Sequence, residues 1–239
     1  MPTYLYCLGT DRARPPDGLT GVDGAVVHAI HASGFMAWVS DVGEKVTPTV
    51  DRVKAHDAVC TAAMSAGETV LPVRFGQTFP DDTAVASGLA ERESVLRSRL
   101  ARIAGCVELR LVMRRDDDPR DGAPAVDAMD TAGEGIDAPR RADGPGTAFL
   151  KRLAGRGRAD LAREVRCEEA RHAIRSAATS LIVGQHPCES ARGISFFPVL
   201  VRRADVDAFR IAVAEILRIK AIPLSVLGPF PPYSFAGDA

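Results

Sequence analysis

The pair of residues with the spacing best suited to chemistry is His56 and Cys60, four positions apart in a segment with helical periodicity. Residues four apart lie on the same face of a helix and can act together on a metal ion. The two also share an apolar stripe with Val53 and Met64, which favours a packed core pair. An enzyme would need these two side chains and a carboxylate to converge on solvent.

Other histidine and cysteine spacings are weaker signals. His28 and His31 belong to a predicted strand, where residues three apart face opposite sides of the sheet. His186 and Cys188 flank a proline and resemble half of a zinc site without a second pair. Nucleophile elbow, SxxK and phosphate-loop patterns are absent from the sequence. We therefore expect no catalytic residue, no metal ion and no cofactor, and a protein that is not an enzyme.

The charge distribution is informative in one region. Ten lysine and arginine residues occur between Arg140 and Arg175, against five acidic ones, although the net charge of the whole chain is −1. A basic helix can follow phosphates, but no nucleic-acid-binding motif accompanies this one. A solvated face, or a docking face for an acidic protein, is the preferred interpretation, and we expect no nucleic acid partner.

Composition places the chain among ordinary globular proteins, with 46% hydrophobic residues in 239. Its five cysteines are odd in number and scattered, which is typical of reduced, mostly buried thiols. The N-terminal sequence lacks the pattern of a signal peptide. No apolar stretch approaches the roughly 18 residues that span a bilayer. We expect a cytoplasmic protein without membrane contact.

One break in composition organises the chain. Residues 114–146 are rich in Asp, Gly, Pro and Ala and hold few large apolar side chains, so they cannot bury enough surface to offset the entropy of ordering. We predict a domain at residues 1–114, a flexible acidic, Gly- and Pro-containing linker at 115–146, and a second domain at 147–239.

In the first half, apolar patterns predict a strand at residues 4–8, a hairpin of 25–30 with 35–40, and a helix at 48–66. A short strand at 69–75, one long helix at about 82–104 and a strand at 106–114 follow. In that last strand Glu108, Arg110 and Arg114 are predicted to face away from the buried side. The pattern predicts an α+β fold, its first domain ferredoxin-like, with an antiparallel sheet covered by helices on one face.

The second half begins with a helical region from 147 to about 183, predicted to break near Gly155 and Gly157. A strand at 194–201, an amphipathic helix at 205–219 and a strand at 222–227 follow. We therefore expect a helical region combined with a small α/β unit, ending in a Pro-rich aromatic tail.

Two segments are unusual enough to be candidate interaction sites. In residues 69–76 (TVLPVRFG), proline confines the segment to an edge strand or a strand end. Either Arg74 forms a structural ion pair that fixes the sheet end, or Arg74 and Phe75 belong to an edge that receives a partner. In residues 228–235 (GPFPPYSF), prolines stiffen an extended tail. Its aromatic residues Phe230, Tyr233 and Phe235 either pack across the protein itself or are offered to another chain.

These two segments, together with 4–6 (YLY), 55–57 (AHD) and 146–150 (GTAFL), resemble the gas vesicle protein F/L family (GvpL/GvpF) in order and over nearly the whole chain. Two positions depart from the family pattern: Phe230, where a tryptophan is common, and Phe149, where a tyrosine is common.

The resemblance implies a two-domain, non-enzymatic cytoplasmic protein of the gas vesicle. It implies an assembly factor with a chaperone-like role, which binds the major shell protein (GvpA type) and other accessory proteins, prevents aggregation or helps nucleate the vesicle, and is a minor vesicle component. A ferredoxin-like regulatory protein that binds a small ligand is the alternative.

Overall fold

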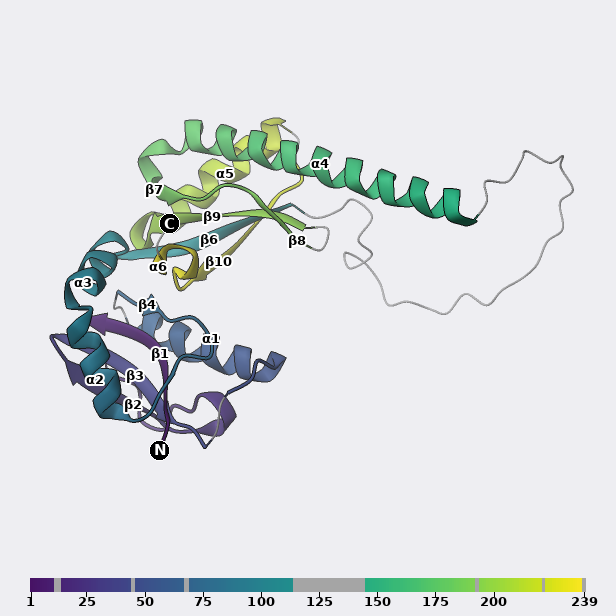
Figure 1. Cartoon of the computed structure of the whole chain (residues 1–239). Coiled ribbons are helices and arrows are strands. Elements are labelled where there is room, and N and C mark those ends of the chain that lie inside the picture. Colours follow the sequence, from purple (N-terminus) through teal and green to yellow (C-terminus); the bar gives the residue numbers. More distant parts are fainter. Residues whose placement is uncertain are drawn as a thin grey trace, which may run out of the picture.

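The computed structural model describes residues 1–10, 14–43, 46–66, 69–113, 145–191, 194–220 and 222–237, with side chains in the long helix from residue 161 onward. The chain builds two antiparallel sheets, each with its own helices (Figure 1). The predicted α+β class, with an antiparallel ferredoxin-like sheet in the first unit, is confirmed, and the sheet of the second unit is antiparallel as well. The predicted linker falls on residues outside the described part up to 144, and Pro145 and Gly146 at its end already belong to a helix.

The first sheet has the strand order β2-β3-β1-β4, with the short β5 also paired to β1. Its elements are β1 (Thr3–Thr10), β2 (Val27–Ala32), β3 (Phe35–Asp41), α1 (Val50–Ser65), β4 (Leu71–Pro72), β5 (Thr78–Phe79), α2 (Asp82–Glu91) and α3 (Glu93–Arg102). Read from β4, this is the order of a ferredoxin-like sheet. The connection from β1 to β2 holds a 3-10 turn at Val22–Gly24 in its described residues, in the place of the first helix of that fold.

Helices cover both faces of this sheet, so the prediction of helices on one face was wrong. One face of β1 packs Tyr4 and Tyr6 against α1, and the other packs Leu5 against α2 and α3. Because β1 and β3 are buried on both sides, nearly every residue in them is apolar or paired. Local caps start the helices: the Thr49 hydroxyl accepts from the Arg52 N–H at 3.3 Å, and Asp81 accepts from the Ala84 N–H at 2.8 Å.

The second sheet has the order β10-β6-β9-β7, with β8 paired to β9. Its elements are β6 (Cys106–Met113), α4 (Pro145–Ala177), β7 (Ile182–Gln185), β8 (Glu189–Ala191), β9 (Ile194–Arg202), α5 (Val206–Lys220), β10 (Ser225–Phe230) and the short α6 (Tyr233–Ala236). Short 3-10 turns at Thr179–Leu181 and Arg203–Asp205 precede β7 and α5. Helices α4 and α5 cover the sheet face turned away from the first sheet, and α6 lies on the side of the first sheet (Figure 1).

Strand β6 corrects the predicted boundary, because it pairs with β9 along its whole length and with β10. The strand predicted to close the first half therefore belongs to the second sheet. Its register with β9 joins Cys106 to Arg202 and Met113 to Ser195. Pairing with a strand almost ninety positions later cannot be recognised in a local pattern, which is why the sequence placed it with its neighbours in the chain.

Four other elements differ from expectation. Of the strand predicted at 69–75, only Leu71–Pro72 forms β4; Pro72 has no N–H to donate, but the Val73 N–H still donates to the Tyr6 carbonyl at 2.9 Å. The helix predicted at 82–104 is divided at Arg92, whose backbone leaves helical geometry. Helix α4 is continuous through Gly155 and Gly157, since a single glycine costs a helix only about 1 kcal/mol. The last strand starts at Ser225 instead of 222.

Candidate interaction surfaces

A buried polar cluster joins α1 to β1, with His56 at its centre. The His56 ring lies with Nδ1 2.9 Å from the Tyr4 hydroxyl and Nε2 3.1 Å from the Val73 carbonyl. The Cys60 sulfur is 3.7 Å from His56 Nε2 and donates to the Tyr6 carbonyl. The predicted packed core pair of His56 and Cys60 is confirmed.

The burial of this cluster decides what it can do. His56 is 3% exposed and Cys60 is 0% exposed, so a substrate in solvent has no path to the pair. Burial raises the pKa of the Tyr4 and Tyr6 hydroxyls above the ordinary value, which keeps both neutral. The arrangement has the contacts of a hydrogen-bonded core and ties α1 to β1.

Arg74 and Phe75 lie beside this cluster but have different surroundings. The Phe75 ring is half-buried and packs edge-on against Tyr4 and His56, at centroid distances of 5.9 and 5.7 Å. The next residue, Gly76, has a φ of +90° and donates its N–H to the Tyr4 hydroxyl. Arg74 is exposed. Of this pair, Phe75 is held by the core, whereas the Arg74 side chain is exposed to solvent.

The C-terminal segment is held on the protein itself by Glu108 of β6. The carboxylate of Glu108 accepts from the Ser234 N–H at 2.7 Å, from the Ser234 hydroxyl at 3.0 Å and from Arg110 at 2.7 Å. Arg102 of α3 donates to the Phe235 carbonyl at 2.7 Å. Glu108 is 0% exposed, so the prediction that it faces away from the buried side as a surface residue was wrong.

The aromatic residues of this segment fill space between the two sheets. Phe235 is buried among side chains of both sheets, with the His186 ring 4.6 Å from its own. Tyr233 packs against the α1 side of the first sheet, with its ring centroid 6.4 Å from that of His56. Phe230 is half-buried under the Arg110 guanidinium, 5.5 Å from the ring centroid. The first of the two alternatives, packing across the protein itself, is the one observed.

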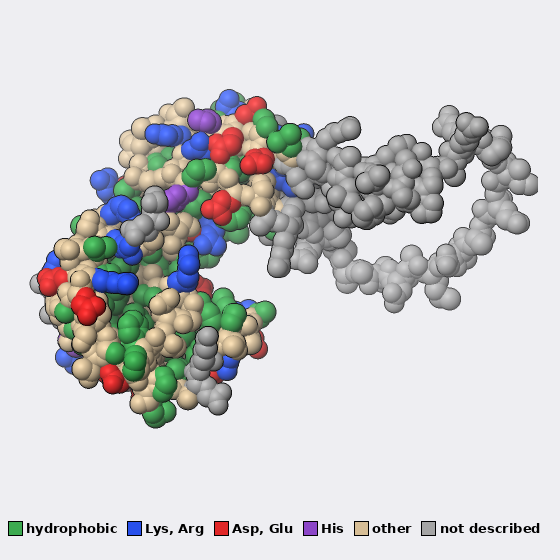
Figure 2. Space-filling model, viewed as in Figure 1, with side chains coloured by type: hydrophobic (Ala, Val, Ile, Leu, Met, Phe, Trp, Pro, Cys, Tyr) green, Lys and Arg blue, Asp and Glu red, His purple; other side chains and the backbone are tan. Residues whose placement is uncertain are grey.

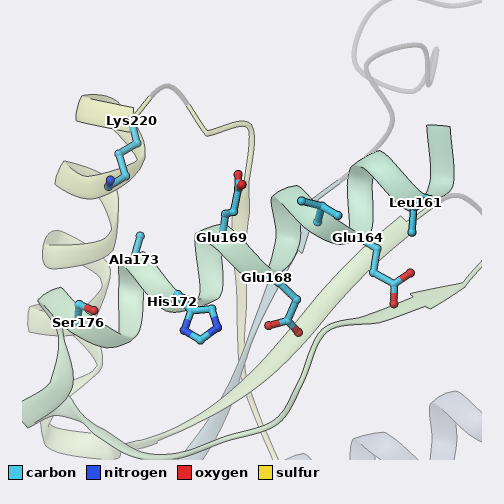
Figure 3. Close-up of a pocket in the computed structure, with 9 residues that line it drawn as sticks. Leu161, Glu164, Glu168, Glu169, His172, Ala173, Ser176 and Lys220 are labelled. Atoms are coloured by element: carbon cyan, nitrogen blue, oxygen red, sulfur yellow. The ribbon is translucent and has the colours of Figure 1, made fainter. Parts of the chain in front are cut away.

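A hollow in the described surface lies on α4 and was not predicted. We call it the α4 groove, with a volume of about 650 Å³. Figure 3 shows its side chains along the solvent side of α4, with Lys220 at the end of α5 beside them. The groove is lined by Leu161, Glu164, Val165, Glu168, Glu169, His172, Ala173, Ser176 and Lys220.

Exposed aliphatic residues in the α4 groove are the signal that the sequence offered. Leu161 and Val165 are four positions apart on α4 and remain 62% and 51% exposed. The buried face of the same helix is a separate stripe that includes Cys167, Ala170 and Ile174. The helix thus has apolar residues on two faces, and only one of them packs on the sheet.

No three His, Cys, Asp or Glu side chains gather as a metal-binding group within the described part. His186 and Cys188, considered above as half of a zinc site, separate: His186 contacts Phe235, and Cys188 packs with the cluster around Cys167. The cysteines are all free, four of them buried. Among the helices in the described ranges, none has the length and hydrophobicity needed to cross a membrane.

Comparison with known proteins gives one consistent answer. The family model described as gas vesicle synthesis protein GvpL/GvpF matches residues 2–237. Gas vesicle protein F of a Streptomyces species (strain CB03234) is 31% identical over 98% of this chain and 99% of its own. Gas vesicle protein L2 of Halobacterium salinarum is 28% identical over 98% of this chain and 91% of its own.

Solved structures share the fold over the same length. The crystal structure of GvpF from Anabaena sp. PCC7120 has a TM-score of 0.70 at 19% identity, covering 100% of this chain and 97% of that one. GvpF from Microcystis aeruginosa has a TM-score of 0.67 at 18% identity, covering 99% of both chains. With the fold and nearly all of the sequence in agreement, this chain belongs to the GvpL/GvpF family of gas vesicle synthesis proteins.

Proposed function

We propose that this protein is a gas vesicle assembly factor that binds the major vesicle shell protein in the cytoplasm. In this role it covers the surfaces of the shell subunit until the subunit is added to the growing vesicle, or helps to nucleate the first assembly. It acts by protein contact, without a cofactor or a chemical step. Other accessory proteins of the vesicle are further partners, and the protein stays with the vesicle as a minor component.

The observation that carries this proposal is the length of the match. The family model spans residues 2–237, so it includes both sheets, the groups that hold the C-terminal segment and the α4 groove. The match also covers 99% of gas vesicle protein F of the Streptomyces species and 99% of GvpF from Microcystis aeruginosa. A shared architecture over the whole chain supports a shared role in making gas vesicles.

The physical reason for such a factor is the behaviour of a shell subunit. A protein that polymerises through apolar surfaces and strand edges is prone to aggregate before it assembles. A soluble partner that covers these surfaces reversibly lowers the concentration of free, sticky subunits. The described surface of this chain offers two accessible candidates for such contacts, Arg74 just after β4 and the α4 groove.

The experiment is a pull-down of the major shell protein with the purified full-length chain, together with deletion of its gene in the host. We expect the shell protein to be retained and vesicles to be lost or reduced in the deletion strain. Antibody detection on purified vesicles, before and after the outer surface is stripped, tests whether the protein remains there. Absence of binding together with normal vesicles in the deletion strain would remove the proposal.

The alternative of a small-ligand sensor makes a different prediction. A sensor gains thermal stability when its ligand is added, in proportion to ligand concentration over Kd. A thermal-shift screen against cellular metabolites therefore separates the two functions. We expect no metabolite to raise the melting temperature, and a saturable increase would favour the sensor.

A further inference from the structure

The α4 groove has the dimensions of a binding site for an extended partner. Its lining on α4 runs from Leu161 to Ser176, which is about 22 Å at the rise of about 1.5 Å per residue in a helix. Leu161 and Val165 keep more than half of their surface exposed, so the groove does not enclose a small molecule. A second helix laid along α4 would cover these side chains over about four turns.

The charges beside the aliphatic residues indicate what kind of helix fits. Glu164 and Glu169 are exposed carboxylates in the lining, and Glu168 lies between them. Lys220 of α5 is the lysine of the lining, at the same end of the groove as Ala173 and Ser176 (Figure 3). Figure 2 shows acidic, basic and hydrophobic side chains together on the layer that contains α4. Arg166 and Arg175 of the same helix are also exposed but do not line the groove. Within the lining, three glutamates stand against one lysine, which is complementary to a helix with an apolar stripe flanked by basic residues.

Glu168 has a second role that keeps the lining in place. Its carboxylate accepts from the Cys188 N–H at 2.8 Å and from Arg171 at 2.7 Å. These bonds tie α4 to the segment between β7 and β8. The helix therefore presents Glu164 and Glu169 from a backbone that is anchored to the sheet, and a partner helix does not need to order it.

We propose that the α4 groove is the docking surface for an amphipathic helix of the partner protein, with its aliphatic stripe on Leu161 and Val165 and its basic flank on Glu164 and Glu169. The inference rests on the proposed function, since it assigns the place where the shell protein is received. In this assignment, one face of α4 binds the partner and the opposite face packs on the second sheet.

The first arm of the test measures retention of the shell protein by full-length variants. Glu164→Lys with Glu169→Lys, and separately Leu161→Ser with Val165→Ser, are expected to weaken binding at least tenfold. Matched controls change acidic or aliphatic residues elsewhere on the exposed surface: Asp17→Lys with Glu91→Lys, and Val26→Ser with Ile211→Ser. The controls are expected to stay within twofold of the unchanged protein, and all variants to keep its melting temperature.

The second arm uses synthetic peptides and does not depend on the shell protein. An 18-residue amphipathic helix with a leucine stripe and a lysine flank is compared with a twin carrying glutamates on that flank. Fluorescence anisotropy is expected to show binding of the lysine peptide alone, weakening as salt is added and lost in the Glu164→Lys, Glu169→Lys variant. Equal binding of both peptides, or of neither, overturns the assignment.

The two arms separate this inference from the proposed function. If the shell protein binds the unchanged chain and both groove variants equally well, the groove assignment is wrong and the function stands. If the shell protein does not bind at all, the function fails and the peptides alone decide the groove. A dimer in light scattering that dissociates on Leu161→Ser with Val165→Ser would show that a second copy covers the groove, which also overturns the assignment.

Discussion

The C-terminal segment and the outer face of α4 both carry apolar residues, but the structure buries those of the segment and leaves those of α4 exposed. Phe235 of the segment is 7% exposed, whereas Leu161 of α4 is 62% exposed. The segment is held by a buried carboxylate and an arginine from two other elements. On the α4 face, Leu161 and Val165 stay more than half exposed in the described part of the chain.

This difference shows that aromatic content is a poor guide to a binding surface here. A Pro-rich tail with three aromatic residues has the composition of a recognition motif, yet its side chains close the space between the two sheets. The aliphatic residues on α4 are fewer and smaller, but they are the ones left in contact with solvent. Arg74 is therefore a better candidate for partner binding than Tyr233 or Phe235.

The largest expected effect on stability comes from a substitution in the C-terminal segment. Phe235→Ala removes a buried ring packed against both sheets and should lower the free energy of unfolding by about 3–5 kcal/mol. Urea denaturation measures it, with Ile211→Ala, a 72% exposed residue, as the control within about 0.5 kcal/mol. Equal stability of Phe235→Ala and the unchanged chain would mean that the segment is not part of the core.

The next effect tests the anchor of the segment. Glu108→Gln keeps the shape of the side chain but weakens its bonds to Ser234 and Arg110, and should cost about 1–3 kcal/mol. The matched control is Glu215→Gln, which removes an exposed pair with Arg218 and should change stability by less than about 1 kcal/mol. Limited proteolysis of Glu108→Gln should also cut near the C-terminus first, and protection equal to that of the unchanged chain contradicts the anchoring role.

A smaller effect is the pH dependence of the stability that Glu168 gives by attaching α4 to the segment between β7 and β8. The Cys188 N–H, and then Arg171, hold the pKa of Glu168 below its ordinary value of 4.5. Because the pKa is lowered in the folded state, the stabilisation is complete above the ordinary pKa of 4.5 and is lost as the pH falls through the folded-state pKa. Glu168→Gln should therefore be less stable than the unchanged chain at pH 6, with a difference that shrinks toward pH 3. A difference independent of pH would exclude the ion pair as its cause.

The smallest effect is on the stability of the α4 face. Val165→Ser alters a side chain that is half exposed and should change the free energy of unfolding by less than about 0.5 kcal/mol. Chemical denaturation of this variant is the measurement. A loss above 2 kcal/mol would show that Val165 is buried against another part of the chain, and the comparison between the two regions would no longer hold.

Local pattern predicted much of the fold. The hairpin of β2 with β3, helices α1 and α5, and strand β9 lie where their periodicity placed them. The packing of His56 with Cys60 followed from the apolar stripe they share with Met64. The α4 groove was missed because the long helix was considered only for its basic residues, while Leu161 and Val165 carry the apolar signal on its outer face.

By itself, the sequence determined the types of the main elements and, through short ordered motifs over nearly the whole chain, the family. Only the tertiary structure decided that β6 joins the second sheet, that Glu108 is buried and that the aromatic tail is internal. The physical reason is distance along the chain: periodicity depends on neighbours a few residues apart, whereas Glu108 meets Ser234 across 126 positions. Burial at that separation depends on which elements the folded chain brings together.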